Sequence, residues 1–112
     1  MIKVTIKLNS KTGVEQFKMI GHADSGPYGQ DIVCAAASVL AINTINSIEQ
    51  IVGVKPETSE DSENGGLLTA KFSADHTRDQ LLQMQAILRS FVIGMNDVAN
   101  NYSQFIKVNI QE

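Results

Sequence analysis

The stretch IKVTIKL, residues 2–8, alternates apolar and polar side chains along its whole length. Successive side chains of a β-strand point to opposite faces, so this stretch predicts a strand that buries one face. Turn-forming residues follow at 9–13, where Gly13 suits a positive φ. A second strand is predicted from about 14 to 20, and it ends at Gly21 and His22. The chain therefore opens with a β-hairpin.

The next long segment, residues 32–52, has helical character and three consecutive alanines. Asp31 is a good N-cap and Gly53 a good C′ residue for this helix. Apolar side chains occur almost all round its first half. We therefore expect the helix to be buried centrally or at an oligomer interface.

The remainder predicts two more strands, a second long helix and a last strand. Thr77-Arg-Asp-Gln80 is a capping box, which places the start of the second helix. In order, the segments are a short edge strand at 54–58 that contains Pro56, an acidic turn at 57–66, a strand at 67–72, a helix from Thr77 to about Asn100, and a strand at 106–110. The predicted fold class is α+β, in the order ββαββαβ, with two long helices packed on a mixed β-sheet. Residues 1–112 form one domain.

Composition narrows the class of protein. The net charge of −3 argues against a nucleic-acid backbone as the direct partner. The apolar stretch 32–42 is interrupted by Ser38 and is too short to span a bilayer, so no membrane partner is expected. A single cysteine fits a reducing cytoplasm. One cysteine and two histidines do not form a zinc pattern, so neither a metal nor a cofactor is expected.

Cys34 and His22 are the residues with the clearest chemical potential. If Asp31 caps the helix, Cys34 lies in the first turn, where free N–H groups and the helix dipole favour a thiolate. His22 ends the second strand at the mouth of the same loop, so the two side chains could meet and act as nucleophile and base. A lone cysteine among alanines is also typical of a small buried apolar residue. Residue pattern alone leaves both interpretations open.

The neighbours of this pair also have alternative interpretations. Asp31 could orient His22 or only cap the helix. Ser38, one turn after Cys34, could bind the substrate backbone or bond back to the Cys34 carbonyl. Gly21 and the N–H of Cys34 could donate to an oxyanion, although Gly21 could equally end the strand. The loop 23–30 could be a lid that orders on substrate or an ordinary connection.

The residues of this region resemble a known family. The segments Gly21-His22-Ala23 and Gly29-Gln-Asp31-Ile-Val-Cys34-Ala-Ala-Ala-Ser38, joined by the loop that contains Gly26, closely resemble the signature of the ribosomal-processing cysteine proteases, the Prp family. The resemblance implies a homodimeric cytosolic endopeptidase. Such an enzyme removes the N-terminal extension of large-subunit ribosomal protein twenty-seven, after a hydrophobic, Phe-containing segment. Cys34 would be its nucleophile, His22 its base, and Gly26, Tyr28 and Gly29 part of its lid loop.

Two other functions remain in view. A non-enzymatic dimeric module that binds a ribosome-assembly partner would explain the fold and the apolar helix. It would leave the Gly-His pair and the Asp-x-x-Cys arrangement without a purpose. A thiol hydrolase that acts on a small molecule is the other alternative, and turnover of a peptide substrate separates it from a protease.

Overall fold

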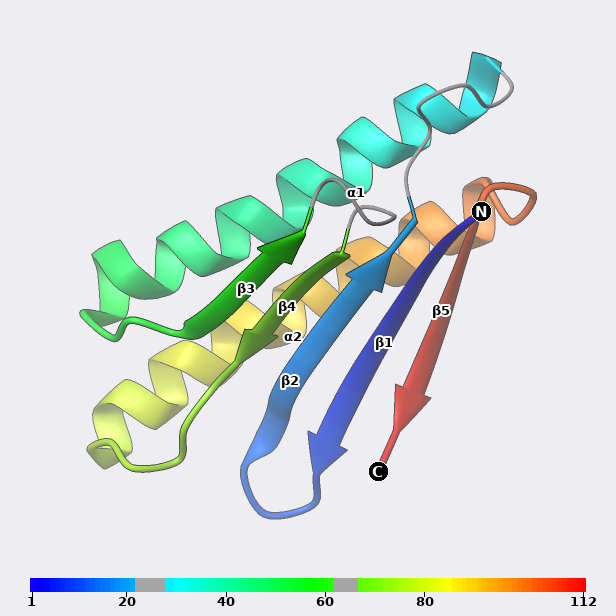
Figure 1. Cartoon of the computed structure of the whole chain (residues 1–112). Coiled ribbons are helices and arrows are strands. Elements are labelled where there is room, and N and C mark those ends of the chain that lie inside the picture. Colours follow the sequence, from blue (N-terminus) through cyan, green and yellow to red (C-terminus); the bar gives the residue numbers. More distant parts are fainter. Residues whose placement is uncertain (22–27, 62–66) are drawn as a thin grey trace.

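Two helices cover one face of a five-stranded sheet in the computed structural model of the chain (Figure 1). The structure describes residues 1–21, 28–61 and 67–112, with the backbone alone for residues 28–31. The elements are β1 (Ile2–Asn9), β2 (Gly13–Ile20), α1 (Tyr28–Ser47), the π-helix η1 (Ile48–Val52), β3 (Glu57–Asp61), β4 (Leu67–Lys71), α2 (Arg78–Asn101) and β5 (Ile106–Gln111). The predicted α+β class and the ββαββαβ order are confirmed.

The strand order in the sheet is β3-β4-β2-β1-β5. β1 pairs antiparallel with β2, as the predicted hairpin requires, and parallel with β5. The remaining pairs are antiparallel, so the sheet is mixed. The hairpin turn ends at Gly13, whose φ of 89° confirms the predicted positive value. The predicted hairpin is therefore confirmed, and the structure adds that β5 lies beside β1 and β4 beside β2.

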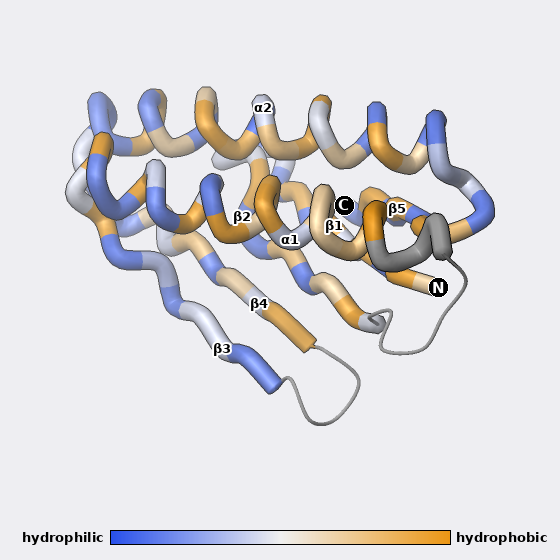
Figure 2. The backbone as a smooth tube through the Cα atoms, turned by 90° about the horizontal axis from the view of Figure 1, so that it is seen from above, coloured by the Kyte–Doolittle hydropathy of each residue, from blue (hydrophilic) through white to orange (hydrophobic). Residues whose placement is uncertain are grey.

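The core lies between the sheet and the helices. Ile2, Val4 and Ile6 of β1 are buried, which confirms the alternation that predicted this strand. Phe17 of β2 stacks on Phe91 of α2 with 4.4 Å between the ring centroids. Figure 2 shows α1 and α2 side by side, with hydrophobic and hydrophilic segments alternating along both helices. Burial of these side chains is the main force that holds the helices on the sheet.

Helix α2 begins where the capping box predicts. The Thr77 side chain accepts a hydrogen bond from the Gln80 N–H at 3.2 Å, and the Gln80 side chain accepts one from the Thr77 N–H at 3.1 Å. Met84, Leu88, Phe91 and Met95 are buried along one face of the helix. Two free N–H groups are thus satisfied by local side chains, which fixes the helix start.

Helix α1 differs from its prediction at the start. It begins at Tyr28, so the expected N-cap at Asp31 is wrong and Asp31 lies inside the first turn. At the other end the prediction is confirmed, because Gly53 ends the helical segment with a φ of 78°. Gly29 is helical, and glycine is tolerated near a helix start because few intrahelical bonds depend on it there.

One face of α1 is buried, and the opposite face is exposed. Val33, Ala37 and Ala41 point into the core, whereas Val39 is 65% exposed. Residues 32–52 are long and apolar enough to cross a membrane, by length and composition only. The sequence estimate of 32–42 was too short, because the uncharged run continues to Ile48. The same two criteria are met by the core helix of a compact domain.

Strand β3 lies three residues later than predicted. Glu57–Asp61 pair with β4, so the acidic turn expected from residue 57 is wrong for its first five residues, and 62–66 lie outside the described residues. The expected edge position is confirmed, with Pro56 just before the strand. An edge strand exposes much of its surface, which allows charged residues such as Glu57 and Glu60 to form one.

Candidate active site

Cys34 lies in the second turn of α1, as the seventh residue of the helix. Its side chain is partly buried and packs against the core, but it is not sealed inside it. The helix start and the end of β2 lie at the same end of the sheet, because residues 22–27 join the two elements directly (Figure 1). Cys34 is therefore only partly covered by the core, in the helix that follows the strand end leading into His22.

The early start of α1 changes what the backbone near Cys34 offers. Only about the first four N–H groups of a helix lack an intrahelical partner. Cys34 lies beyond them, so its own N–H is engaged within the helix and is a poor candidate for an oxyanion donor. Asp31 still lies in the first turn of the helix by its backbone, and its side chain lies outside the described part of the structure. Its expected orienting action on His22 stays a prediction.

Ser38 lies one turn after Cys34 and is half-buried. Within the described chain, its hydroxyl forms no hydrogen bond back to the Cys34 carbonyl. Thr44 of the same helix shows the contrasting case, since its Oγ1 donates to the Leu40 carbonyl at 2.7 Å. Of the two alternatives for Ser38, the back-bond is absent. The hydroxyl is left available to a ligand.

Gly21 adopts a conformation that other residues avoid. Its φ is 97°, and a Cβ added here would lie 2.5 Å from the carbonyl oxygen of Met1. The glycine thus turns the chain sharply at the end of β2, against the backbone that begins β1. This is the strand-ending role considered for Gly21, while its expected donation to an oxyanion stays a prediction.

Several predicted site residues have no described side chain. His22 and Gly26 lie outside the described residues, as does the loop from 23 to 27. Tyr28 and Gly29 are helical in backbone, so the lid loop expected at 23–30 is wrong in its last three residues. The expected contact between His22 and Cys34 stays a prediction.

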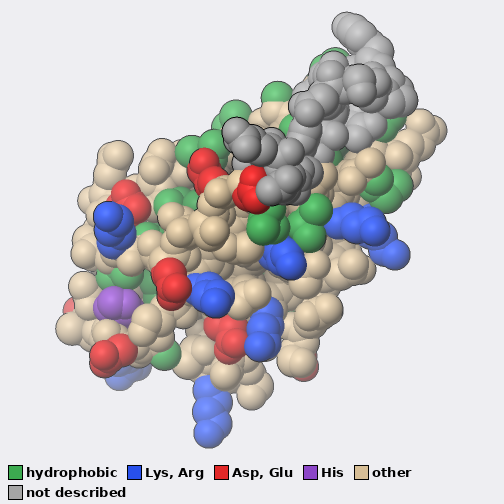
Figure 3. Space-filling model, in the orientation of Figure 1, with side chains coloured by type: hydrophobic (Ala, Val, Ile, Leu, Met, Phe, Trp, Pro, Cys, Tyr) green, Lys and Arg blue, Asp and Glu red, His purple; other side chains and the backbone are tan. Residues whose placement is uncertain are grey.

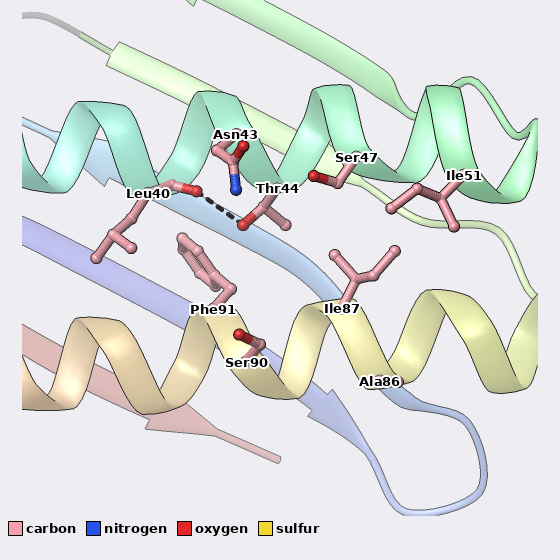
Figure 4. A pocket seen from close by; sticks show the side chains of 9 residues that line it. All are labelled: Leu40, Asn43, Thr44, Ser47, Ile51, Ala86, Ile87, Ser90 and Phe91. Carbon is pink, nitrogen blue, oxygen red and sulfur yellow. Dashed lines mark hydrogen bonds between the residues drawn. The ribbon is translucent and has the colours of Figure 1, made fainter.

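A trough runs between α1 and α2 on the side that faces away from the sheet. One part of it has a volume of about 330 Å³, and Figure 4 shows its lining: Leu40, Asn43, Thr44, Ser47, Ile51, Ala86, Ile87, Ser90 and Phe91. A second part shares Leu40 and reaches Ala35, Ala36 and Gly94. Sequence patterns did not predict this trough, because it depends on how the two helices pack.

Cys34 does not line this trough. With 3.6 residues per turn, Ala36 and Leu40 lie on the flank of α1 next to α2, whereas Cys34 and Ser38 lie on the opposite flank. The thiol and the hydroxyl therefore share a surface that the second helix does not cover. The candidate site is this flank of α1 together with the end of β2.

Comparison with known proteins gives a consistent result. Residues 1–107 match the family model described as cysteine protease Prp. The ribosomal processing cysteine protease Prp of Staphylococcus aureus is 34% identical over 109 residues, which cover 97% of this chain and 98% of the relative. The protein of the same name from Bacillus subtilis is 24% identical over 108 residues, with 96% of each chain covered.

Solved structures agree in fold over almost the whole chain. The crystal structure of SMU.848 from Streptococcus mutans has a TM-score of 0.88 and 31% identity, covering 99% of this chain and 94% of that one. The S. aureus protease Prp in complex with a substrate peptide has a TM-score of 0.84 and 29% identity, with 99% and 100% covered. A structure of the same S. aureus protease holds a covalently linked product peptide.

Proposed function

Because this chain belongs to the Prp family of ribosomal-processing cysteine proteases, we propose that it removes the N-terminal extension of large-subunit ribosomal protein twenty-seven. Cleavage follows a hydrophobic, Phe-containing segment, with Cys34 as the nucleophile and His22 as the base. The observation that carries the proposal is that Cys34, the single cysteine, is only partly buried on the flank of α1, the helix that follows the strand end leading into His22. A covalently linked product in the S. aureus relative also supports covalent chemistry.

The proposed reaction has two steps. The Cys34 thiolate attacks the scissile carbonyl, and the tetrahedral intermediate expels the amine, which takes a proton from His22. This leaves a thioester between Cys34 and the new carboxyl end of the extension. His22 then removes a proton from water, which hydrolyses the thioester and frees the thiol.

Ser38 and Gly21 have supporting roles in this proposal. The Ser38 hydroxyl lacks a back-bond within the described chain and lies one turn from Cys34, so it binds the substrate backbone. Gly21 directs the chain into His22 by a turn that only glycine makes without strain. Asp31 lies at the helix start and orients His22. All of these groups belong to the chain itself, so the reaction needs no added cofactor.

Mass spectrometry of the extended ribosomal protein, after incubation with wild type or Cys34→Ala, tests the proposal. We expect the wild-type protein to release the extension and Cys34→Ala to leave it intact. Cys34→Ala removes one sulfur from a partly buried position, so thermal unfolding should confirm that the variant is folded. Cleavage by folded Cys34→Ala at the wild-type rate would refute the role of Cys34. No cleavage by the wild type would refute the substrate.

We also propose that the enzyme is a cytoplasmic homodimer that pairs through α1. Residues 32–48 carry no charge, and Ile32, Ala35, Val39 and Ile42 form an exposed stripe at heptad-like spacing on the outer face of α1. A stripe without charges cannot form ion pairs with a charged partner. It can pack against the same apolar stripe of a second copy of the chain. Two such stripes packed about a two-fold axis would bury these side chains. The reducing cytoplasm suits an enzyme whose single cysteine must stay a thiol.

Sedimentation velocity of Val39→Asp tests the dimer. We expect the wild type to sediment with the mass of two chains and Val39→Asp with the mass of one. Leu82→Asp is the matched control, because Leu82 is 60% exposed on α2 and the substitution makes the same change in charge. A wild-type monomer, or equal dissociation of both variants, would contradict pairing through α1.

A further inference from the structure

The open face of the sheet carries five of the nine basic residues of the chain. Ile2, Val4 and Ile6 of β1 point into the core, so Lys3 and Lys7 point to the other side of the sheet. By the same alternation, three lysines of other strands point outward, namely Lys18 of β2, Lys71 of β4 and Lys107 of β5. Figure 3 shows this face, where Lys and Arg side chains lie among Asp and Glu side chains.

Four of these lysines form a diagonal row across four strands. Lys107 is the register partner of Lys3. Lys18 pairs with Thr5, one strand over and two residues further along β1. Lys71 pairs with Gln16, again one strand over and two residues further along. Three strand spacings of about 4.8 Å and four residues of about 3.4 Å give a row of about 20 Å.

In the described part of the chain, no lysine of the row forms an ion pair within 4 Å, although Glu57 is the register partner of Lys71. Lys7, which stands off the row, forms an ion pair with Glu15 at 3.4 Å, but the four lysines of the row form none. Lys3 and Lys107 stand side by side in register, and like charges in that position destabilise a sheet. The other acidic residues of this face lie on β3, where Glu57 is the register partner of Lys71 and Asp61 pairs with Leu67, so only the Lys71 end of the row has a carboxylate beside it. A bound polyanion would relieve this repulsion.

We propose that this lysine row binds the phosphodiester backbone of a nucleic acid without reading its sequence. A row of four cations spread over about 20 Å suits a strand of regularly spaced phosphates. Thr5, Thr69 and Asn109 lie among the lysines and supply the short polar side chains that contact phosphate oxygens. In the described strands no aromatic residue points outward from this face, so base stacking is not available and recognition rests on charge.

The net charge of −3 led us to expect no direct nucleic-acid partner. That sum combines the lysine face with an acidic remainder of the molecule. Binding depends on the local field, which falls off over about 10 Å at ordinary ionic strength. Because α1 and α2 cover the opposite face of the sheet, the row and the Cys34 flank are separate surfaces. A failure of the nucleic-acid proposal would therefore not contradict the proposed protease site, and the reverse also holds.

Fluorescence anisotropy with labelled single-stranded oligouridine tests the proposal, with oligothymidine and polyglutamate as the comparison arms. The logarithm of the binding constant should fall with the logarithm of salt concentration with a slope of about −3, as four contacts to a single strand predict. RNA and DNA should bind alike, because the phosphodiester is the shared feature. Polyglutamate should bind at least tenfold more weakly, by our estimate, since it lacks the phosphate array.

Two double variants with the same change in charge provide the decisive comparison. Lys3→Gln/Lys18→Gln should weaken binding by about tenfold or more and flatten the salt slope by about 1.4. Lys11→Gln/Lys55→Gln removes two lysines outside the row and should change binding by less than about twofold. The row is not the binding site if both variants lose affinity equally or if the first binds like wild type. Absence of binding by wild type at low salt, or equal binding of polyglutamate, would overturn the proposal.

Discussion

The side-chain amide of Gln85 holds both backbone groups of Val14. Its Oε1 accepts a hydrogen bond from the Val14 N–H at 2.8 Å, and its Nε2 donates to the Val14 carbonyl at 3.0 Å. The Gln85 side chain thereby makes the two hydrogen bonds with Val14 that a neighbouring strand would make. The same amide fills the space next to Gly13, where any side chain would collide with it.

Gln85→Ala should therefore destabilise the fold. It leaves two backbone groups at the buried residue Val14 without these partners, and each unsatisfied group costs about 1–3 kcal/mol. We expect a loss of about 2 kcal/mol in the free energy of unfolding, measured by urea titration. Gln83→Ala is the matched control, because Gln83 is exposed on the same helix. Equal effects of the two variants would show that the contact to Val14 is energetically unimportant.

Thr77→Ala should weaken the start of α2. The substitution removes the oxygen that accepts from the Gln80 N–H, and loss of an N-cap typically costs about 1 kcal/mol. Thr77→Ser keeps the oxygen and should retain most of the stability. Urea titration of both variants measures the difference. A Thr77→Ser protein as unstable as Thr77→Ala would mean that packing of the methyl group, and not the cap, matters here.

Gly21→Ala should impair both stability and proteolysis. The alanine must adopt a positive φ and must also move away from the Met1 carbonyl oxygen. Gly53→Ala is a matched control, since Gly53 has a positive φ but nothing within 4 Å of an added Cβ. Backbone strain alone costs about 1–2 kcal/mol, so Gly53→Ala should lose about that much in thermal unfolding and keep full activity. Gly21→Ala should lose more, together with most of its peptide cleavage. Full activity of Gly21→Ala would show that the turn does not position His22.

Ser38→Ala should lower kcat/KM for peptide cleavage without changing alkylation of Cys34. One hydrogen bond to the substrate contributes about 0.5–1.5 kcal/mol, or a loss of about twofold to tenfold. Ser47→Ala, on the trough flank of α1, is the control and should be neutral. If Ser38→Ala instead slows alkylation by iodoacetamide, the hydroxyl acts on the thiol and not on the substrate.

His22→Ala should abolish the fast reaction of Cys34 with a thiol alkylator near pH 7. A histidine base maintains the thiolate, so without it the cysteine should react as an ordinary thiol. His76→Ala is the control, because His76 precedes α2 and has no part in the proposed site. The measurement is the rate of Cys34 alkylation in His22→Ala and in His76→Ala, each compared with the rate in wild type. Unchanged kinetics for His22→Ala would contradict the proposed role of His22 as the base that activates Cys34.

The parts of the fold that local signals control could be predicted from sequence. Alternation placed β1 and β5, and the capping box at Thr77 placed the start of α2. The start of α1 could not be placed, because the glycine at 29 was interpreted as a loop residue although a first helical turn tolerates it. β3 was misplaced because its pairing with β4, and not an apolar pattern, makes it a strand.

In the candidate site too, local features could be predicted from sequence and features that depend on the fold could not. Cys34 and Ser38 could be assigned to one helical face from their spacing alone, and the structure agrees. That the Cys34 N–H is engaged within the helix could not be predicted, because it depends on where the helix begins. The lysine row was also invisible in the sequence, since Lys3, Lys18, Lys71 and Lys107 become neighbours only once the strand order is known.

The contact between Met1 and Gly21 has a practical consequence for how the protein is handled. The Met1 carbonyl lies against the residue that leads into His22, so an affinity tag fused ahead of Met1 would emerge beside the proposed catalytic end of the sheet. β5 runs parallel to β1 and ends near Lys7, so Glu112 lies at the far end of the same sheet. A purification handle attached after Glu112 would leave the approach of a peptide to Cys34 unobstructed. Activities measured with tags at the two ends should therefore be compared before any is assigned to the enzyme itself.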